Sequence, residues 1–175
     1  GDPALPLDVS QCVFPAERDW FAAFARGRTG WPVIAAFADE WQNPASLLAD
    51  GIENVWLEFD TGRSPLPGVF LKLREAGDGQ PDADQWQVAK NALKLLLPNH
   101  HDHLRRCFEI AGDVGIVTHL GVMLSRPSTA VRLNVAVESA AAAQDYLSAC
   151  GWPGLPPPLA ETFEQVFEYV QPPIL

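Results

Sequence analysis

Two pairs of short runs, in which apolar residues alternate with other residues, constrain the fold more than any other feature. The first pair spans residues 53–60 and 69–74, and the second spans residues 115–125 and 131–138. Alternation places successive side chains on opposite faces, so each run predicts a strand and each pair predicts a β-hairpin. The connector at residues 61–68 contains two Pro and two Gly, which predicts a loop longer than a tight turn.

Most of the segments before, between and after these hairpins have the sequence periodicity of helices. Apolar residues recur there every three or four positions, and capping residues or Pro near the start and Gly or Pro near the end are typical helix boundaries. Residues 1–15 contain three Pro and predict an extended lead-in instead. The predicted helices span residues 15–26, 31–41, 44–51, 84–97, 99–112, 140–150 and 159–170.

The order of elements is α-α, β-β, α-α, β-β, α-α, which indicates a repeated pattern. We expect two β-β-α-α units of about 60 residues each, at 53–112 and 113–175, after a helical lead-in at 1–52. The predicted fold class is α+β, in one domain over residues 1–175. It has a four-stranded, mainly antiparallel sheet built from the two β-hairpins, with helices packed on one face and an N-terminal helical pair.

Composition and charge narrow the classes of partner. The content of 47% hydrophobic residues is typical of a globular protein and argues against disorder. The formal net charge is −10, which disfavours nucleic acid because phosphate binding needs a basic surface. No apolar stretch approaches the ~20 residues that a membrane-spanning helix needs, and no signal peptide is recognisable. We therefore expect neither a nucleic-acid nor a membrane partner.

The three cysteines, Cys12, Cys107 and Cys150, are widely spaced and form no C-x-x-C motif. This usage predicts reduced thiols in a cytoplasmic protein. Cys107 and Cys150 fall on apolar helix stripes, where thiols are usually buried and unreactive.

The two faces of the predicted sheet differ in composition. One face is uniformly apolar and is expected to pack against the helices. The other mixes large aromatic residues, a Met and a His with charges of both signs, whereas a plain solvent face favours Thr, Ser, Lys and Glu. An ordinary solvent face is a strong alternative interpretation, because mixed charges on an open sheet form cross-strand pairs and Trp56 with Phe70 could form an aromatic pair. The mixed face also contains Asp60 and Glu138, and its candidate ligand- or partner-binding residues are Trp56, Glu58, Phe70, Lys72, Arg74, His119, Met123, Arg132 and Asn134.

The leading functional hypothesis is a binding or protein-interaction module that uses this mixed face. Aromatic residues beside Arg are the composition that interface hot spots favour. Open strand edges, or two mixed faces meeting across a two-fold axis, would also permit a homodimer.

The alternative hypothesis is an enzyme or enzyme subunit that acts on a small anionic or aromatic substrate. In that case Lys72, Arg74 and Arg132 would hold the anion, and Trp56 and Phe70 would stack on the substrate. The sequence contains no nucleotide-binding or common hydrolase motif that would identify the chemistry.

Glu58 and His119 are the weak catalytic candidates, because an acid and a base on neighbouring strands could transfer a proton. The segment 99–103 also contains three His and one Asp, and His103 with Cys107 could share an ion. Consecutive helical residues point in different directions, so a capped helix start is the preferred interpretation. We expect no metal and no cofactor.

The α-α-β-β order of elements resembles the repeating unit of aromatic prenyltransferase barrels. Proteins of that family hold substrates inside an antiparallel barrel lined by basic and aromatic side chains. The resemblance lies in element order alone, and it implies an antiparallel sheet with such a lining on one face. Four strands cannot close such a barrel within one chain.

Overall fold

The computed structural model describes residues 8–60, 65–75, 85–98, 103–126, 130–152 and 157–169. Contacts divide the chain into two compact units. Unit 1 comprises Gly1–His100 with Thr118–Asn134, and unit 2 comprises His101–Val117 with Val135–Leu175. These boundaries differ from the predicted repeat units, and the β-β-α-α repeat is not confirmed.

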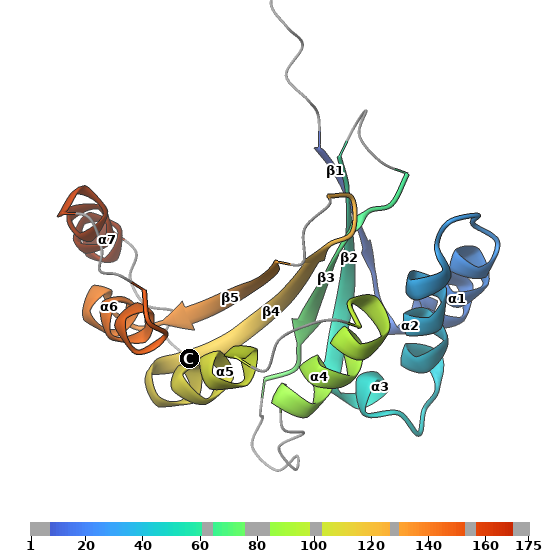
Figure 1. Ribbon diagram of the computed structural model, residues 1–175, viewed down its shortest axis with the longest axis horizontal. Coiled ribbons are helices and arrows are strands. Elements are labelled where there is room, and N and C mark those ends of the chain that lie inside the picture. Colours follow the sequence, from blue (N-terminus) through green and yellow to red (C-terminus); the bar gives the residue numbers. More distant parts are fainter. Residues whose placement is uncertain are drawn as a thin grey trace, which may run out of the picture. The chain divides into compact units, whose positions relative to one another are not determined.

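The strands form one sheet in the order β1-β2-β3-β4-β5, so neighbours in the chain are neighbours in the sheet (Figure 1). The pairs β1–β2, β2–β3 and β3–β4 are antiparallel. The α+β class with a mainly antiparallel sheet is therefore confirmed. The strands are β1 (Asp8–Val13), β2 (Ile52–Asp60), β3 (Gly68–Leu73), β4 (Gly115–Met123) and β5 (Val131–Val137).

The described residues also contain seven α-helices and one 3-10 helix. Unit 1 contains η1 (Pro15–Glu17), α1 (Arg18–Arg26), α2 (Pro32–Gln42), α3 (Leu47–Gly51) and α4 (Gln85–Leu96). Unit 2 contains α5 (His103–Val114), α6 (Ala140–Ala149) and α7 (Pro157–Tyr169). None of these described helices has both the length and the apolar run that crossing a membrane requires.

The prediction of four strands is wrong, because β1 adds a fifth. Its six residues pair with β2 from Asp8 opposite Asp60 to Val13 opposite Val55. The strand lies at the sheet edge, and Val13 is its one buried residue among those whose burial is described. An edge strand that buries so little carries a weak hydrophobic pattern, which explains why the lead-in looked irregular.

The apolar face of the sheet in unit 1 packs under α3 and α4. Leu57 lies opposite Val69, and Val69 lies opposite Val122, and all three are almost fully buried. At Gly51 in α3, an added Cβ would lie 2.2 Å from Cγ2 of Val88 in α4, so only glycine permits this close approach. The predicted apolar face is thus the core of unit 1.

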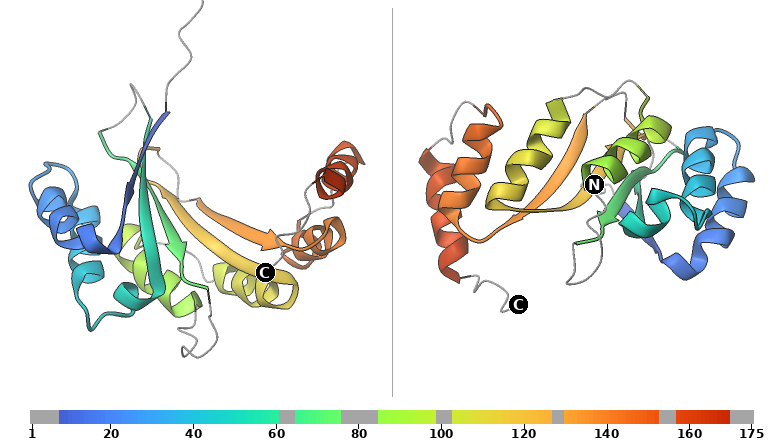
Figure 2. Two further views of the ribbon diagram at one scale, coloured as in Figure 1. Left: turned by 180° about the vertical axis from the view of Figure 1, so that it is seen from behind. Right: turned by 90° about the horizontal axis from the view of Figure 1, so that it is seen from below.

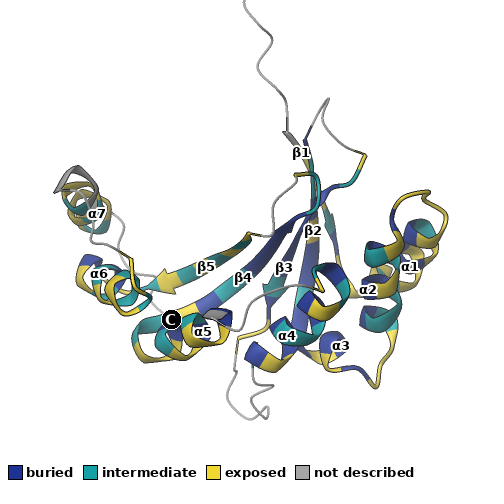
Figure 3. Ribbon diagram, viewed as in Figure 1, coloured by how far each residue is buried: buried dark blue, intermediate teal, exposed yellow. Residues whose placement is uncertain are grey.

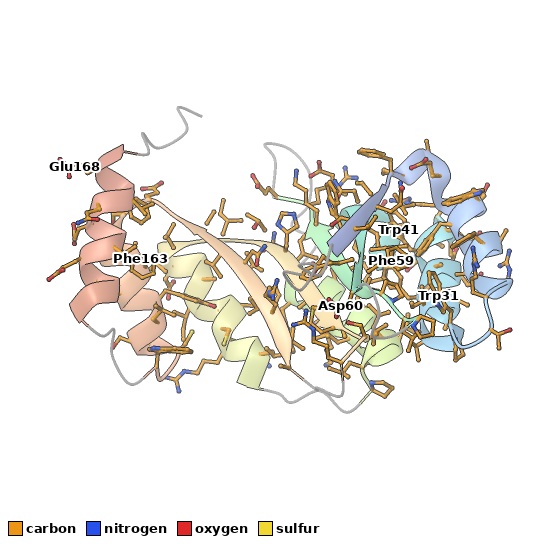
Figure 4. All side chains as sticks on the ribbon, turned by 90° about the horizontal axis from the view of Figure 1, so that it is seen from above. Trp31, Trp41, Phe59, Asp60, Phe163 and Glu168 are labelled. Carbon is orange, nitrogen blue, oxygen red and sulfur yellow. The ribbon has the colours of Figure 1, made fainter. Side chains whose placement is uncertain are left out.

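Aromatic rings extend this core toward α1 and α2. The ring of Trp31 stacks on Phe59 at the end of β2, with centroids 6.3 Å apart, and Figure 4 labels both residues. Phe21 of α1 meets Trp41 of α2 edge to face at 6.3 Å. The stack of Trp31 on Phe59 therefore joins the predicted N-terminal helical pair to the sheet, and the contact of Phe21 with Trp41 joins the two helices to each other.

Unit 2 is built around the packing of α5 on α6 and of α6 on α7. Ser139 caps α6, because its side chain accepts a hydrogen bond of 3.1 Å from the backbone N–H of Ala142. The predicted stripe of α5 is buried at Leu104, Phe108 and Ala111. Helix α7 keeps most of its described surface exposed (Figure 3).

Candidate functional site

The open face of unit 1 is the side of β2, β3 and β4 that points away from α3 and α4. The view from behind shows these strands in front of α4 (Figure 2). No helix of the described part of unit 1 lies over this side. The open face comprises Cys12, Asn54, Trp56, Glu58, Asp60, Gly68, Phe70, Lys72, His119, Gly121, Met123, Ser125 and Arg132.

A row of four residues crosses the middle of the open face. The strand register sets Cys12 opposite Trp56, Trp56 opposite Phe70, and Phe70 opposite Gly121. Directly opposed residues in antiparallel strands have Cβ atoms about 4.5–5.5 Å apart, so these residues are neighbours on one face of the sheet. Phe70 is buried in this row, whereas 40% of Trp56 remains exposed. Trp56 is therefore the ring that an approaching molecule would touch.

Two glycines keep the middle of the open face flat. A Cβ added to Gly121 would lie 2.4 Å from Cε1 of Phe70, so the Phe70 ring occupies the space above this glycine. A Cβ added to Gly68 would lie 3.3 Å from Sδ of Met123 and 3.3 Å from Cε2 of Phe70. Phe70 and Met123 thus lie across glycine backbone. These two side chains and that of Trp56, which the register sets opposite Phe70, are together called the apolar platform.

An ion pair borders the platform on one side. Nζ of Lys72 lies 2.9 Å from Oε1 of Glu53, beside a register irregularity in β2. His119 lies opposite Lys72, and its Nδ1 is 3.0 Å from Oγ1 of Thr118. Burial and the positive charge of Lys72 lower the pKa of His119, while the carboxylate of Glu53 opposes this shift. His119 therefore favours its neutral form more strongly than an exposed histidine does.

Asn54 is a further polar residue in this part of the open face. It lies opposite Lys72 and is 8% exposed. Its side-chain oxygen is buried and has no hydrogen-bond partner among the residues that the structure describes.

A second ion pair borders the platform at the far end of β2. Asp60 is 6% exposed, and its carboxylate accepts hydrogen bonds from Nε and Nη2 of Arg126 at 3.1 and 3.0 Å. Ser125 Oγ donates a third bond of 2.7 Å to the same carboxylate. Sequence analysis did not identify this cluster of Asp60, Ser125 and Arg126, which we call the clamp. The pairing joins residues 66 positions apart, which no local pattern reveals.

Two charges on the open face have no ion-pair partner among the described residues. The guanidinium of Arg132 lies over the Phe70 ring, 5.4 Å from its centroid, which is a cation–π contact. Glu58 lies on β2 beside Trp56 and forms no ion pair within the described part of the chain. Within the described residues, the apolar platform is therefore flanked by one carboxylate and one guanidinium that form no ion pair.

The structure brings seven of the predicted site residues together on the open face: Trp56, Glu58, Phe70, Lys72, His119, Met123 and Arg132. Two others lie at its margin. Arg74 follows the end of β3, and its backbone N–H donates a bond of 2.9 Å to the carbonyl of Gly51. Asn134 is exposed on β5, and its carbonyl accepts a bond of 3.2 Å from Thr118 Oγ1. Their binding roles stay predictions.

Glu58 and His119 are not brought together as an acid–base pair. Glu58 lies opposite Gly68, which lies opposite Met123, whereas His119 lies opposite Lys72. The two rows are four residues apart, which is about 13 Å along a strand. Direct proton transfer between these two side chains is outside hydrogen-bonding reach.

The predicted metal alternative rests mainly on residues outside the described part of the chain. His100, His101 and Asp102 lie there, and the side chain of His103 is also not described. Among the described residues, no group of three or more His, Cys, Asp or Glu could hold a metal ion. The expectation of no metal and no cofactor stays a prediction.

Unit 2 contains a separate hollow of about 540 Å³. Three of its lining residues are acidic, namely Asp113, Glu138 and Asp145, and none is basic. The hollow lacks both the aromatic residues and the paired charges of the open face. The open face is therefore the stronger candidate site.

No known protein family, curated protein or solved structure matches the chain. The resemblance in element order to aromatic prenyltransferase barrels thus carries no residue-level correspondence. The functional argument rests on the open face alone.

Proposed function

We propose that the chain is a binding module that recognises another protein through the open face of unit 1. The observation that carries this proposal is the exposed ring of Trp56 at the edge of an apolar platform that no described helix of unit 1 covers. Tryptophan and arginine are the residues most enriched in interface hot spots, and Trp56 and Arg132 flank Phe70.

The shape of the platform favours a protein surface over a small molecule. Phe70 and Met123 lie close over the backbone of Gly121 and Gly68, so these side chains fill the space above the two glycines. Small-molecule sites are concave and enclose most of their ligand. A flat apolar centre with a polar border is the usual anatomy of a protein interface.

The charges on the open face support the same choice. Lys72 is neutralised by Glu53, and Arg126 by Asp60. Glu58 and Arg132, which form no ion pair with any residue that the structure describes, have opposite signs. A partner with complementary charges of both signs therefore fits the charged residues around the apolar platform better than an anion does. A second copy of the chain is one such partner, and the proposal places the encounter in the cytoplasm.

One observation favours the alternative of a small anionic or aromatic ligand held by an enzyme or enzyme subunit. Arg132 has no carboxylate partner in the described part of the chain and lies over the ring of Phe70, which the register sets opposite Trp56. An aromatic anion could stack on Trp56 while Arg132 binds its charge. The unpaired carboxylate of Glu58 opposes this arrangement.

Quantitative affinity capture from an extract of the source cells tests the proposal. The baits are the wild-type chain, Trp56→Asp and the matched variant Trp20→Asp. Trp20 lies on α1 and is 55% exposed, so it controls for the loss of an exposed tryptophan elsewhere. We expect a defined set of proteins that wild type and Trp20→Asp retain and Trp56→Asp loses. Identical capture by all three baits would refute the proposal.

A further inference from the structure

A chain of two hydrogen bonds joins the ring of His119 on β4 to the backbone of β5. Nδ1 of His119 lies 3.0 Å from Oγ1 of Thr118, and Thr118 Oγ1 donates a bond of 3.2 Å to the carbonyl of Asn134. All three residues belong to unit 1. A hydroxyl has one proton and a carbonyl oxygen only accepts, so the Thr118 proton is used in the bond to Asn134. The bond between His119 and Thr118 therefore requires the ring proton to be on Nδ1.

This arrangement determines which ring nitrogen of His119 is left for another molecule. A neutral imidazole has one N–H donor and one acceptor nitrogen, and the bond made by one nitrogen fixes the state of the other. With the proton on Nδ1, Nε2 is the acceptor. His119 is half-buried, and Nε2 forms no hydrogen bond with any residue that the structure describes. Nε2 is also not among the buried side-chain atoms that lack a partner in the described part of the chain. A group approaching the open face can therefore reach it.

The charges around His119 favour an uncharged donor at Nε2. Lys72 lies opposite on β3, and its Nζ is 2.9 Å from Oε1 of Glu53 on β2. Burial and then the charge of Lys72 lower the pKa of His119, and the opposing effect of Glu53 is smaller. On β5, the guanidinium of Arg132 lies over the Phe70 ring. The ring of His119 thus experiences more repulsion than attraction toward a cation, which a hydroxyl or an amide N–H avoids.

We propose that Thr118 holds His119 in the tautomer with its proton on Nδ1, and that Nε2 accepts a hydrogen bond from an uncharged donor of the partner. This inference rests on the proposed function, because the donor belongs to a protein bound at the open face. His119 lies two residues from Gly121 on β4, so it is one row away from Phe70 on the same face. The apolar platform provides contact area, and Nε2 provides a directional bond that a partner without a matching donor cannot form.

The tautomer is measured by nuclear magnetic resonance on the full chain with isotope-labelled histidine. At pH 8 (about 1.5 units above the ordinary histidine pKa) the nitrogen chemical shifts show which ring nitrogen carries the proton. The signals of His119 are those missing from His119→Gln. We expect a protonated Nδ1 and an unprotonated Nε2 in wild type, loss of this preference in Thr118→Val, and its recovery in Thr118→Ser. A proton on Nε2 in wild type, or an unchanged spectrum in Thr118→Val, would overturn the role of Thr118.

The bond to the partner is tested by affinity capture from an extract of the source cells, with wild type, His119→Phe, His119→Gln and Trp56→Asp as baits. Phenylalanine keeps a ring but lacks the acceptor, whereas glutamine supplies an amide oxygen as a replacement acceptor. We expect the proteins that Trp56→Asp loses to be recovered about tenfold less with His119→Phe, because a donor left without an acceptor in a contact is costly, and to be partly regained with His119→Gln. Circular dichroism confirms that each bait is folded.

The outcomes separate this inference from the proposed function. If His119→Phe recovers at the wild-type level the proteins that Trp56→Asp loses, the hydrogen bond at Nε2 is refuted and the proposed function stands. Equal losses with His119→Phe and His119→Gln would also refute the bond, because the acceptor would then make no difference. If Trp56→Asp loses no protein, the proposed function fails and the bond at Nε2 fails with it.

Discussion

The ring of Phe70 lies over Gly121 so closely that a Cβ at position 121 would be 2.4 Å from Cε1 and 2.5 Å from Cδ1 of the ring. Phe70 and Gly121 are directly opposed in β3 and β4. The relationship explains how a large aromatic residue can be 91% buried on a sheet face that no described helix of unit 1 covers, since 9% of it is exposed. The glycine lets the ring lie flat, and the flat ring makes the apolar platform.

Gly121→Ala is therefore expected to disturb the platform. The methyl group displaces the Phe70 ring, and overpacking of this kind costs about 1–3 kcal/mol of unfolding free energy. Chemical denaturation measures the loss. The control is Gly112→Ala in α5, where an added Cβ has no atom within 4 Å and where alanine stabilises a helix interior by roughly 0.5–1 kcal/mol. Equal effects of the two substitutions would contradict the packing described for Phe70.

Asp60→Ala is expected to destabilise the chain by about 1.5–3 kcal/mol, because hydrogen bonds to charged groups are among the stronger ones. It removes an acceptor that binds Arg126 and Ser125 and is 6% exposed. Asp39→Ala is the matched control. Asp39 pairs with Arg26 at the surface, with side-chain exposures of 43% and 51%, and surface pairs contribute under about 1 kcal/mol. Thermal or urea denaturation measures the loss of unfolding free energy in the two variants. A larger loss for Asp39→Ala than for Asp60→Ala would be inconsistent with the contacts of Asp60.

The lowered pKa of His119 predicts a specific pH dependence of stability. The folded state binds a proton at His119 less readily than the unfolded state does, so unfolding is favoured as pH falls from the ordinary value of 6.5 through the lowered pKa. The stability that neutral His119 provides is present above this interval and lost below it. Denaturation curves from pH 7.5 to 5 (roughly the range where histidine titrates) should show a smaller loss for His119→Gln than for wild type.

Removing either of the two charged neighbours of His119 is expected to shift its pKa, in opposite directions, and nuclear magnetic resonance can measure this pKa. Lys72→Ala removes a cause that lowers the pKa of His119 and is expected to raise it. Glu53→Gln removes the opposing carboxylate and is expected to lower it. Titration of the His119 ring signal, assigned by its absence in His119→Gln, reports both. Shifts of the same sign in the two variants would disagree with the described contacts.

Glu58→Gln and Arg132→Gln distinguish a protein partner from a small anionic ligand. A protein with complementary charges of both signs loses affinity to both variants, since each removes one attraction. An anion loses affinity to Arg132→Gln and gains affinity for Glu58→Gln, because a repulsion disappears. Calorimetric titration of the partner found by affinity capture provides the measurement. A gain with Glu58→Gln would favour the small-ligand alternative.

Alternation of apolar residues was sufficient to predict β2, β3 and the buried face of unit 1, because packing imposes that pattern directly on the sequence. The mixed composition around Trp56 and Phe70 also pointed correctly to the face that lacks a helical cover. The edge strand β1 was missed because it buries little. A strand pattern alone also does not give register, and so it could not show that Glu58 and His119 lie in different rows.

The remaining features depend on contacts between distant parts of the chain. The clamp joins Asp60 at the end of β2 to Arg126 in the turn after β4. The Phe70 ring and Gly121 lie on neighbouring strands whose register was unknown from the sequence. In each case the sequence around a single glycine or arginine does not predict which distant residue it contacts, because that contact is formed only in the folded chain.

Photo-crosslinking from the open face tests the central claim most directly. A photoreactive amino acid replaces Trp56 in one variant and Trp20 in a matched variant, and both proteins are irradiated in the source cells. We predict that position 56 gives a discrete adduct with one protein, or with a second copy of the chain, that position 20 does not give. An equal pattern of adducts from both positions, or none from position 56, would contradict the assignment of the open face as a protein-binding surface.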